Sequence, residues 1–299
     1  MGSLREIKSK ISSVKSTQQI TSAMQMVSTV KLSRAERIIE NFRPYQQKLI
    51  ELLSNFLSTE SKDAQPSAFE EERKANKVAI VVFSGNMSLC GAFNSNVAKA
   101  FKETINELSH LPQENIDVYS IGKKITHEVR KLGIEPTFES EALADKPTYE
   151  ATIELAEELM NRFTNKELDQ VIVIYHHFRS KGSQELTTET FLPFSFDEFK
   201  KEENEENKED MIDKEYIDYI IEPNKATITS ELIPQVIKLQ LYTYLLESYT
   251  SEHAARSIAM QGATDNADDL LEELSLKYNK SRQESITSEL LDIIGATFQ

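Results

Sequence analysis

Apolar residues recur with a seven-residue period at both ends of the chain. In the first segment the repeated positions are Ile7, Val14, Thr21, Ser28, Ala35, Phe42, Leu49 and Phe56. In the last segment they are Leu232, Leu239, Leu246, His253, Met260, Ala267 and Leu274. A seven-residue period is typical of a helix whose seam faces another helix. The pattern therefore predicts two long terminal helices that pack against each other in antiparallel orientation.

Both predicted helices are far longer than an ordinary globular helix. The first covers residues 3–57 and contains one proline, Pro44; at a rise of ~1.5 Å per residue it would span about 80 Å. We expect Pro44 to kink or restart this helix, because proline lacks a backbone donor and clashes with the preceding turn. The last helix covers residues 228–294, with Pro234 near its start and Gly262 inside it, and would span about 100 Å.

The middle of the chain alternates strand and helix signals. Residues 78–83 form a continuous apolar run of buried-strand type, and Ser84-Gly85-Asn86 ends it. We expect further strands at 116–121, 171–175, 185–194 and 216–221, and helices at 95–108, 123–132 and 149–163. Strand–helix–strand repeats favour a largely parallel sheet covered by helices. The predicted fold class is α/β: a long antiparallel coiled coil of the two terminal helices plus a central Rossmann-like domain.

These elements divide the chain into four parts. The N-terminal coiled-coil helix takes residues 1–57, a polar linker 58–76, the central α/β domain 77–224 and the C-terminal coiled-coil helix 225–299. Within the central domain, residues 197–215 hold ten acids and four lysines, which predicts a surface loop.

Composition indicates a cytoplasmic protein. The chain is 39% hydrophobic and 28% charged, and its apolar runs are shorter than the ~18 residues of a membrane helix. Residues 1–10 carry charges where a signal peptide has its apolar core. The net charge is -15, yet residues 1–48 carry nine basic and three acidic residues. We therefore expect the N-terminal helix to meet an acidic partner or the acidic C-terminal helix.

Candidate chemical groups are sparse. Gly85 and Gly91 follow a strand but fit neither the dinucleotide fingerprint nor the phosphate-binding loop. Cys90, the single cysteine, is expected to be a packed residue. His176 and His177 are neighbours in a strand, point to opposite faces and make poor joint metal ligands. We predict no catalytic residue, cofactor or metal site.

Two other functions fit the same pattern. The central block could be a nucleotide-binding catalytic domain with helical arms for oligomerisation, which predicts saturable nucleotide binding by the isolated chain. The heptads could also belong to a scaffold that homodimerises through them, which predicts a discrete soluble dimer.

Motifs in both terminal helices resemble the γ subunit of F-type ATP synthases. The N-terminal helix reads Ile7-Lys8-Ser9-Lys10-Ile11 and then Ile20-Thr21-Ser22-Ala23-Met24-Gln25-Met26-Val27. The C-terminal helix reads Ser251-Glu252-His253-Ala254-Ala255-Arg256, then Ala263-Thr264-Asp265-Asn266-Ala267 and Tyr278-Asn279-Lys280-Ser281-Arg282-Gln283. Several linked motifs in order, at both ends of a chain of suitable length, make the resemblance specific.

The resemblance implies a rotor without catalysis of its own. In that family the coiled coil threads a ring of three α and three β subunits, while the central domain, the foot, grips the c-ring and binds the ε subunit. Proton-driven rotation of the c-ring turns the shaft, and its asymmetric faces drive the β sites through their nucleotide states. The implied location is peripheral, at the cytoplasmic face of a bacterial inner membrane, without nucleic acid as a partner.

The resemblance also implies which positions meet the α/β ring, namely Met24, Lys31, Arg256, Arg282, Gln283 and Thr287. Met24 and Lys31 lie one heptad apart and are expected to face the β subunits. Arg282 and Gln283, with Thr287 one turn further, correspond to a region that engages a loop of β. Arg256 is expected to pair with acids of the opposing helix or of β.

One family landmark is altered. The family usually reads Thr-Asp-Arg-Gly-Leu-Cys-Gly-Gly after its first strand, whereas residues 84–92 here read Ser-Gly-Asn-Met-Ser-Leu-Cys-Gly-Ala. The Asp-Arg pair and its contacts are absent. The chain also lacks the cysteine-containing insert of chloroplast γ subunits, so thiol control is not expected.

The seams and the C-terminal tip point to an enclosing partner. The seams turn small or polar at positions such as Thr21, Ser28 and Ala35, which suits a slender shaft more than a self-sufficient coiled coil. Residues 290–298 are apolar where a free helix would fray. A surrounding apolar sleeve would account for both features.

Overall fold

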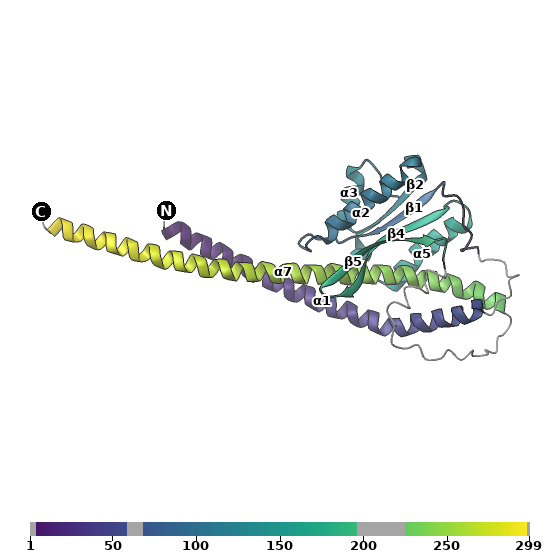
Figure 1. The fold of residues 1–299 in the computed structure, drawn as a ribbon, viewed down its shortest axis with the longest axis horizontal. Coiled ribbons are helices and arrows are strands. Elements are labelled where there is room, and N and C mark those ends of the chain that lie inside the picture. Colours follow the sequence, from purple (N-terminus) through teal and green to yellow (C-terminus); the bar gives the residue numbers. More distant parts are fainter. Residues whose placement is uncertain (1–3, 59–67, 196–224, 298–299) are drawn as a thin grey trace.

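Two long helices and a five-stranded α/β domain make up the part of the protein that the structure describes. The computed structural model describes residues 4–58, 68–195 and 225–297. Helix α1 (Leu4–Ser58) and helix α7 (Lys225–Thr297) lie side by side as a shaft, and the sheet domain, the foot, packs against one end of it. The N- and C-termini lie toward the other end of the shaft (Figure 1).

The two shaft helices are antiparallel, as predicted. Three side-chain contacts between them are 2.8 Å for Thr21–Thr264, 3.0 Å for Thr29–Ser257 and 3.3 Å for Gln46–Thr243, written from the tip towards the foot. Residue numbers rise along α1 while they fall along α7, which defines the antiparallel orientation.

The heptad seams are the buried stripes of the two helices. Thr21, Ser28, Ala35 and Leu49 of α1 are buried, and Ile7, Val14 and Phe42 are half-buried. On α7 the positions from Leu239 to Leu274 are buried at every seventh residue, and Leu232 is half-buried. The predicted seams are therefore confirmed for the side chains that the structure describes, which leave out Phe56.

Pro44 does not restart the first helix. It lies inside α1, which continues through it to Ser58. The proline is exposed, so the carbonyl group that it leaves without a helical partner can face water instead of a buried apolar surface. Of the two expected effects the restart is therefore contradicted, and the kink stays a prediction.

The foot is built on one mixed sheet. Its strands are β1 (Val78–Phe83), β2 (Ile116–Ile121), β3 (Phe138–Ser140), β4 (Gln170–Ser180) and β5 (Ser183–Leu192), in the order β3-β2-β1-β4-β5. The pairs β1–β2, β1–β4 and β2–β3 are parallel, while β5 is antiparallel to β4. The parallel core was predicted, and β5 corresponds to the strand expected at 185–194. The short strand β3 was missed, and the strand expected at 216–221 lies outside the described residues, as does the loop at 197–215.

Helices cover both faces of this sheet. They are α2 (Phe93–Glu107), α3 (Lys123–Lys131), α4 (Glu141–Asp145) and α5 (Tyr149–Thr164), and 3-10 turns at Leu108–His110 and Gln113–Asn115 follow α2. Helix α4 has five residues and was not predicted, because so short an element carries no periodicity. The linker expected at 58–76 is described only from residue 68 onward.

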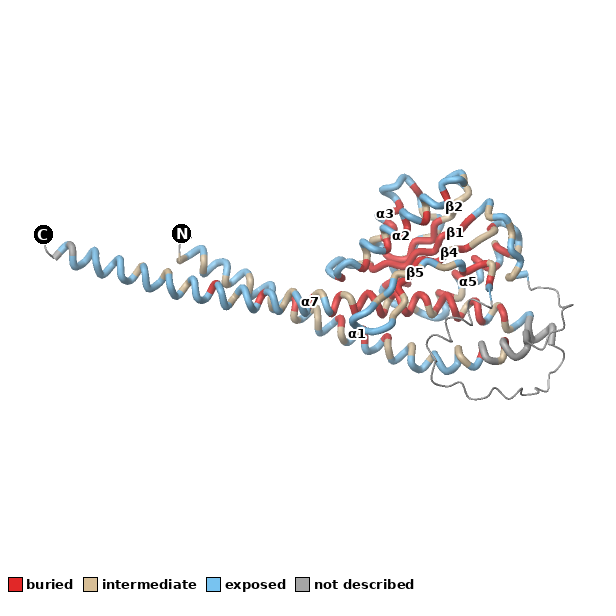
Figure 2. Tube along the Cα trace, in the orientation of Figure 1, coloured by how far each residue is buried: buried red, intermediate tan, exposed pale blue. Residues whose placement is uncertain are grey.

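Strand β1 divides the core between the two faces. Val78, Ile80 and Val82 point into the cluster that holds α2 and α3, whereas Ala79 and Val81 point into the cluster of α5 and α7. The second cluster continues into the shaft through Ile233, Ile237, Leu239 and Leu241 of α7 and Leu49 and Leu53 of α1. Figure 2 shows this buried region extending from the sheet into the adjoining stretch of α7. The foot and the lower shaft therefore share one core.

None of the helices, over the residues described, is long and apolar enough to cross a membrane.

Candidate functional site

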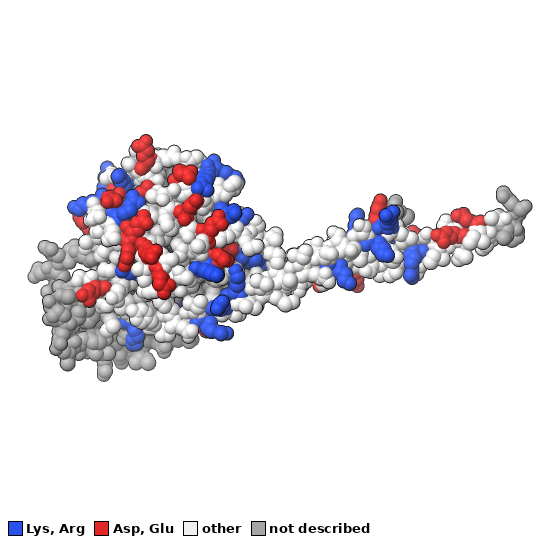
Figure 3. Space-filling model, turned by 180° about the vertical axis from the view of Figure 1, so that it is seen from behind, with Lys and Arg blue, Asp and Glu red and all other residues white. Residues whose placement is uncertain are grey.

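The shaft beyond the foot has a band without charged side chains. Residues 16–30 of α1 and 257–264 of α7 contain no Asp, Glu, Lys or Arg, and we call these two segments the uncharged band. Figure 3 shows the corresponding white stretch of the shaft next to the foot. The band exposes large apolar side chains at Ile20, Met26, Val27, Val30 and Ile258, and Val30 is 69% exposed. An exposed apolar patch of this kind marks an interaction surface.

Inside the band the two helices are joined by polar contacts. Thr21 and Thr264 share a hydrogen bond, as do Thr29 and Ser257. Gln25 contacts Gln261, and the amide of Gln18 donates at 2.8 Å to Asp268, which lies just outside the band. Small and polar seam residues bring the helices together with little apolar burial of their own. The shaft therefore gains less stability per turn here than in the shared core with the foot.

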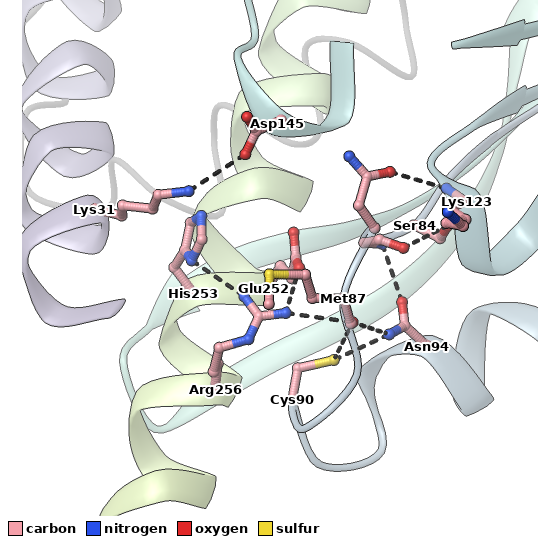
Figure 4. A network of polar contacts seen from close by, with 12 residues as sticks. Lys31, Ser84, Met87, Cys90, Asn94, Lys123, Asp145, Glu252, His253 and Arg256 are labelled. Atoms are coloured by element: carbon pink, nitrogen blue, oxygen red, sulfur yellow. Dashed lines mark hydrogen bonds and ion pairs between the residues drawn. The ribbon is translucent and has the colours of Figure 1, made fainter. Parts of the chain in front are cut away.

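A buried ion pair marks the neck, where α7 leaves the foot. The guanidinium of Arg256 donates to Glu252 at 2.6 Å, and both side chains are more than nine-tenths buried. Its Nη2 also donates to the Met87 carbonyl in the loop after β1 at 3.4 Å, and its Nη1 lies 3.3 Å from Nδ1 of His253 (Figure 4). The expected pairing of Arg256 with an acid of the opposing helix was wrong, because Glu252 lies one turn earlier on the same helix.

Burial shifts the pKa values of Glu252 and His253 in this neck. Burial raises the pKa of Glu252 above its ordinary value, and the neighbouring Arg256 acts in the opposite direction. Burial, reinforced by the charges of Arg256 and Lys31, lowers the pKa of His253 to about 3. His253 is therefore neutral at pH 7, and its Nε2 is among the buried polar atoms that have no hydrogen-bond partner in the described structure.

Gly85, in the loop after β1, accommodates this ion pair. A Cβ atom at Gly85 would overlap the carboxylate of Glu252. β1 and β4 are parallel neighbours, and β2 lies on the other side of β1, so the chain changes direction in the sheet at β1. Ligands of doubly wound domains bind at such a switch point, at the carboxyl ends of the strands. Here the chain's own carboxylate fills the space beside Gly85, and its negative charge disfavours a phosphate there.

Asn86 replaces part of the altered landmark. Its Oδ1 accepts a hydrogen bond from the backbone N–H of Lys123 at 2.9 Å, at the start of α3. Its Nδ2 donates to the carbonyl of Glu141 at 2.8 Å, at the start of α4. One neutral amide therefore joins the loop to two helices, and an aspartate could not make the second of these bonds because its carboxylate has no donor.

Lys31 also has a partner in the foot. Its ammonium lies 3.3 Å from Asp145 in α4, and both side chains are partly exposed. Met24 lies one heptad further along the shaft and is half-buried. Contact of these two residues with an α/β ring stays a prediction, as does contact of Arg256, whose guanidinium would have to leave Glu252 and Met87.

The other three predicted site residues lie near the free end of α7. Arg282, Gln283 and Thr287 are exposed, and the Thr287 hydroxyl donates to the Gln283 carbonyl at 2.9 Å, which confirms that they are one turn apart. Figure 1 shows α7 extending beyond the N-terminus of α1, so this part is a single helix. Leu290 and Leu291 follow, and Leu291 is 63% exposed.

The two histidines of strand β4 make packing and polar contacts within the foot and with α7. His176 is buried and stacks on Phe93, with 4.2 Å between ring centroids, and burial lowers its pKa to about 4. Nδ1 of His177 lies 2.8 Å from the Glu247 carboxylate of α7. Within the described ranges, no group of three His, Cys, Asp or Glu side chains could hold a metal ion.

Sequence reasoning did not single out Asn86, Glu252 or the uncharged band as functional. The band could have been found from the sequence, because a run of fifteen residues without charge, 16–30, stands out in a helix that is basic elsewhere. The spacing of four between Glu252 and Arg256 could have indicated their ion pair, but the contact of Glu252 with the loop after β1 depends on the fold.

Comparison with known proteins gives consistent relatives over the whole length. A profile of the ATP synthase family matches residues 3–297. The ATP synthase gamma chain of Bacteroides fragilis is 49% identical over 297 residues, which cover 99% of each chain. That of Bacteroides thetaiotaomicron is 47% identical over 300 residues, which cover 100% of each chain.

Solved structures share the fold. A chain of the Euglena gracilis mitochondrial ATP synthase matches with a TM-score of 0.63 and 22% identity, covering 99% of this chain and 93% of that one. A chain of the Tetrahymena thermophila mitochondrial enzyme, from its central stalk and c-ring, matches with a TM-score of 0.55 and 21% identity, covering 82% of this chain and 99% of that one. Profile, relatives and fold agree over the two helices and the foot, and the chain therefore belongs to the gamma-chain family of ATP synthases.

Proposed function

We propose that this chain is the shaft that turns inside a ring of three α and three β subunits. As a gamma chain it is a non-catalytic subunit of the central stalk of an F-type ATP synthase. The observation that carries the proposal for the ring is the uncharged band with its exposed apolar residues. Removing such an apolar surface from water would stabilise the complex by about 25 cal/mol for each Å² that is buried.

The band also suits a moving contact. Because it carries no charge, it forms no ion pairs with a surrounding wall, and ion pairs would hold the shaft at fixed angles. The shaft is asymmetric, because the foot packs on one side of it and α7 extends beyond the N-terminus of α1 (Figure 1). Each face therefore presents a different surface to the ring. A turning asymmetric surface can stabilise a different conformation in each β subunit in succession.

The remaining partners follow from the same arrangement. The foot would grip the c-ring and bind the ε subunit, so that rotation of the c-ring driven by protons reaches the shaft. Structural neighbours come from assemblies that contain a c-ring, which supports this orientation. The chain would then lie peripherally at the cytoplasmic face of the bacterial inner membrane.

The free end of α7 would carry the polar contacts with the ring. Arg282, Gln283 and Thr287 present donors and acceptors to solvent on a single exposed helix. Met24 and Lys31 would contribute nearer the foot, Lys31 through the exposed part of its side chain. Arg256 would reach the ring only if its buried pair with Glu252 opened.

Co-expression with the α and β chains of the same organism tests the proposal. We expect a complex with three α, three β and one copy of this chain, and ATPase activity that depends on it. In membranes that carry the complete enzyme with its c-ring, the double change Arg282→Ala and Gln283→Ala should weaken coupling between proton flow and ATPase activity, whereas Glu284→Ala, on the same exposed turn, should not. An active α/β ring that forms equally well without the chain, and binds none of it, would contradict the proposal.

A further inference from the structure

We infer that Glu252 and Arg256 are positioning residues that hold the loop after β1, residues 84–92, against the shaft. The loop lies on the side of the foot from which the shaft emerges (Figures 1 and 4). The inference about loop position rests on the contacts of this chain alone. Its consequence for coupling rests on the proposed function.

Both ends of the ion pair act on the loop. Arg256 donates through Nη2 to the Met87 carbonyl, which also accepts a hydrogen bond from Nδ2 of Asn94 at 3.0 Å. Glu252 lies directly against Gly85, where even a methyl group would overlap its carboxylate. The ion pair therefore contacts the loop at two points, one polar and one steric.

The loop needs such support, because part of it is strained. Leu89 has a φ of 66°, in the left-handed region that an L-residue with a large side chain rarely adopts. Its side chain and that of Met87 are exposed rather than packed in the core, at 59% and 60%. Strain of this kind persists only where the surroundings fix the backbone, and it concentrates at functional positions.

A buried ion pair is poorly explained by stability alone. Removing two charges from water costs several kcal/mol, and well-packed apolar residues of the same volume are often as stable. Nε of Arg256 also has no hydrogen-bond partner among the described groups. The guanidinium supplies what an apolar side chain lacks, a donor for the Met87 carbonyl, so the pair is better explained by the position that it gives the loop.

The chain carries its own reporter for this position. Cys90, the single cysteine, is buried within the loop, where its Sγ accepts a hydrogen bond from Asn94 at 3.1 Å. Burial raises the pKa of its thiol, which keeps the thiol in its unreactive protonated form. The charges of Arg256 and Glu252 also act on this pKa, Arg256 lowering it and Glu252 raising it. Release of the loop exposes Cys90, so the rate of alkylation per thiolate measures how firmly the loop is held.

The experiment follows alkylation of Cys90 by N-ethylmaleimide in the full chain, with mass spectrometry as the readout. We expect Glu252→Gln and Arg256→Met each to raise the rate about 100-fold, because loss of one partner leaves the other charge buried and unpaired. Gly85→Ala should act from the opposite side by displacing the Glu252 carboxylate. Glu273→Gln is the matched control, since it breaks an exposed pair with Lys277 at the same spacing on the same helix.

The double variant Glu252→Gln with Arg256→Met separates positioning from charge balance. It leaves no buried charge, so we expect the chain to recover folding stability relative to the single variants. Alkylation of Cys90 should nevertheless stay fast in the double variant, because no guanidinium holds the Met87 carbonyl. The inference would be overturned if Cys90 were alkylated at the slow wild-type rate in the single variants and in Gly85→Ala, or if the double variant returned to that slow rate.

In the assembled enzyme the same variants should lower the number of protons moved per ATP hydrolysed, with the subunit stoichiometry unchanged. A wild-type chain that fails to assemble contradicts the proposed function and leaves the thiol result standing. Fast Cys90 alkylation with full coupling would mean that the loop position has no part in rotation.

Discussion

Three residues of one helical turn carry the charge and hydrogen bonding of the neck. Glu252 and Arg256 pair in a buried site, and His253 between them faces the Lys31–Asp145 pair (Figure 4). Because His253 is neutral at pH 7, the neck holds one positive and one negative buried charge. The two buried charges therefore balance each other, which suits a joint between two parts of a molecule that turn together.

The buried histidine of the foot makes stability depend on pH. His176 has a pKa of about 4 in the folded chain against 6.5 for the free group, so its contribution is complete above pH 6.5 and is lost as the pH falls. We expect His176→Phe, which keeps a ring for Phe93 to stack on, to flatten the decline of unfolding free energy between pH 6 and 4. The change in slope should be about 1.4 kcal/mol per pH unit.

Urea titrations of the wild type and His176→Phe at matched pH values measure this slope. His110→Phe is the control, because His110 is exposed. Equal slopes for the wild type and His176→Phe would show that His176 titrates normally.

The small seam residues set the distance between the shaft helices. Ala35 is 1% exposed at the contact of α1 with α7. We expect Ala35→Leu to destabilise the chain by about 1–3 kcal/mol, because added methylene groups have no space in a packed interface. Ser33→Leu, which places the same side chain on an exposed position of the same helix, should change the unfolding midpoint little. Denaturant unfolding of both variants gives the comparison.

Element by element, the long repeats were the most predictable part of the chain. The heptads located α1 and α7 to within a few residues, since a seam of many turns averages over local exceptions. Strand β1 was placed at its observed limits because its apolar run is short, is rich in β-branched residues and ends at the turn residues Ser84-Gly85-Asn86. Helix α4 and strand β3 were missed, being too short for any period. Sequence reasoning identified the Ser-Glu-His-Ala-Ala-Arg motif but did not pair Arg256 with Glu252 of the same motif. Its contact with Met87 could not be predicted, because the two residues are 169 positions apart.

At the scale of the whole molecule, the chain divides into a core that holds it together and surfaces that are left for partners. The foot and the lower part of α7 share apolar residues such as Leu241 and Leu245. The uncharged band and the tip instead expose apolar side chains on a thin shaft. A protein that works alone rarely has this distribution, whereas an enclosed shaft requires it.

The exposed tip gives a prediction about assembly. We expect Leu290→Gln with Leu291→Gln to raise the solubility of the isolated chain, because two exposed apolar side chains become polar. The same pair should weaken its binding to an α/β ring by about 1.5–3 kcal/mol per residue if both side chains are buried there. Ser288→Gln, also exposed on this helix, is the control. Competition with wild-type chain for limiting ring measures the loss, and equal incorporation would contradict enclosure of the tip.

The central claim is that the foot and shaft turn as one body inside a fixed ring. The most direct measurement immobilises the assembled ring and follows a bead attached to the foot at Lys99→Cys, an exposed position of α2, with Cys90→Ser to leave one label site. During ATP hydrolysis we predict rotation of the bead in one sense, with a resting position for each β subunit. ATP hydrolysis at the normal rate with a bead that stays still relative to the ring would contradict the account.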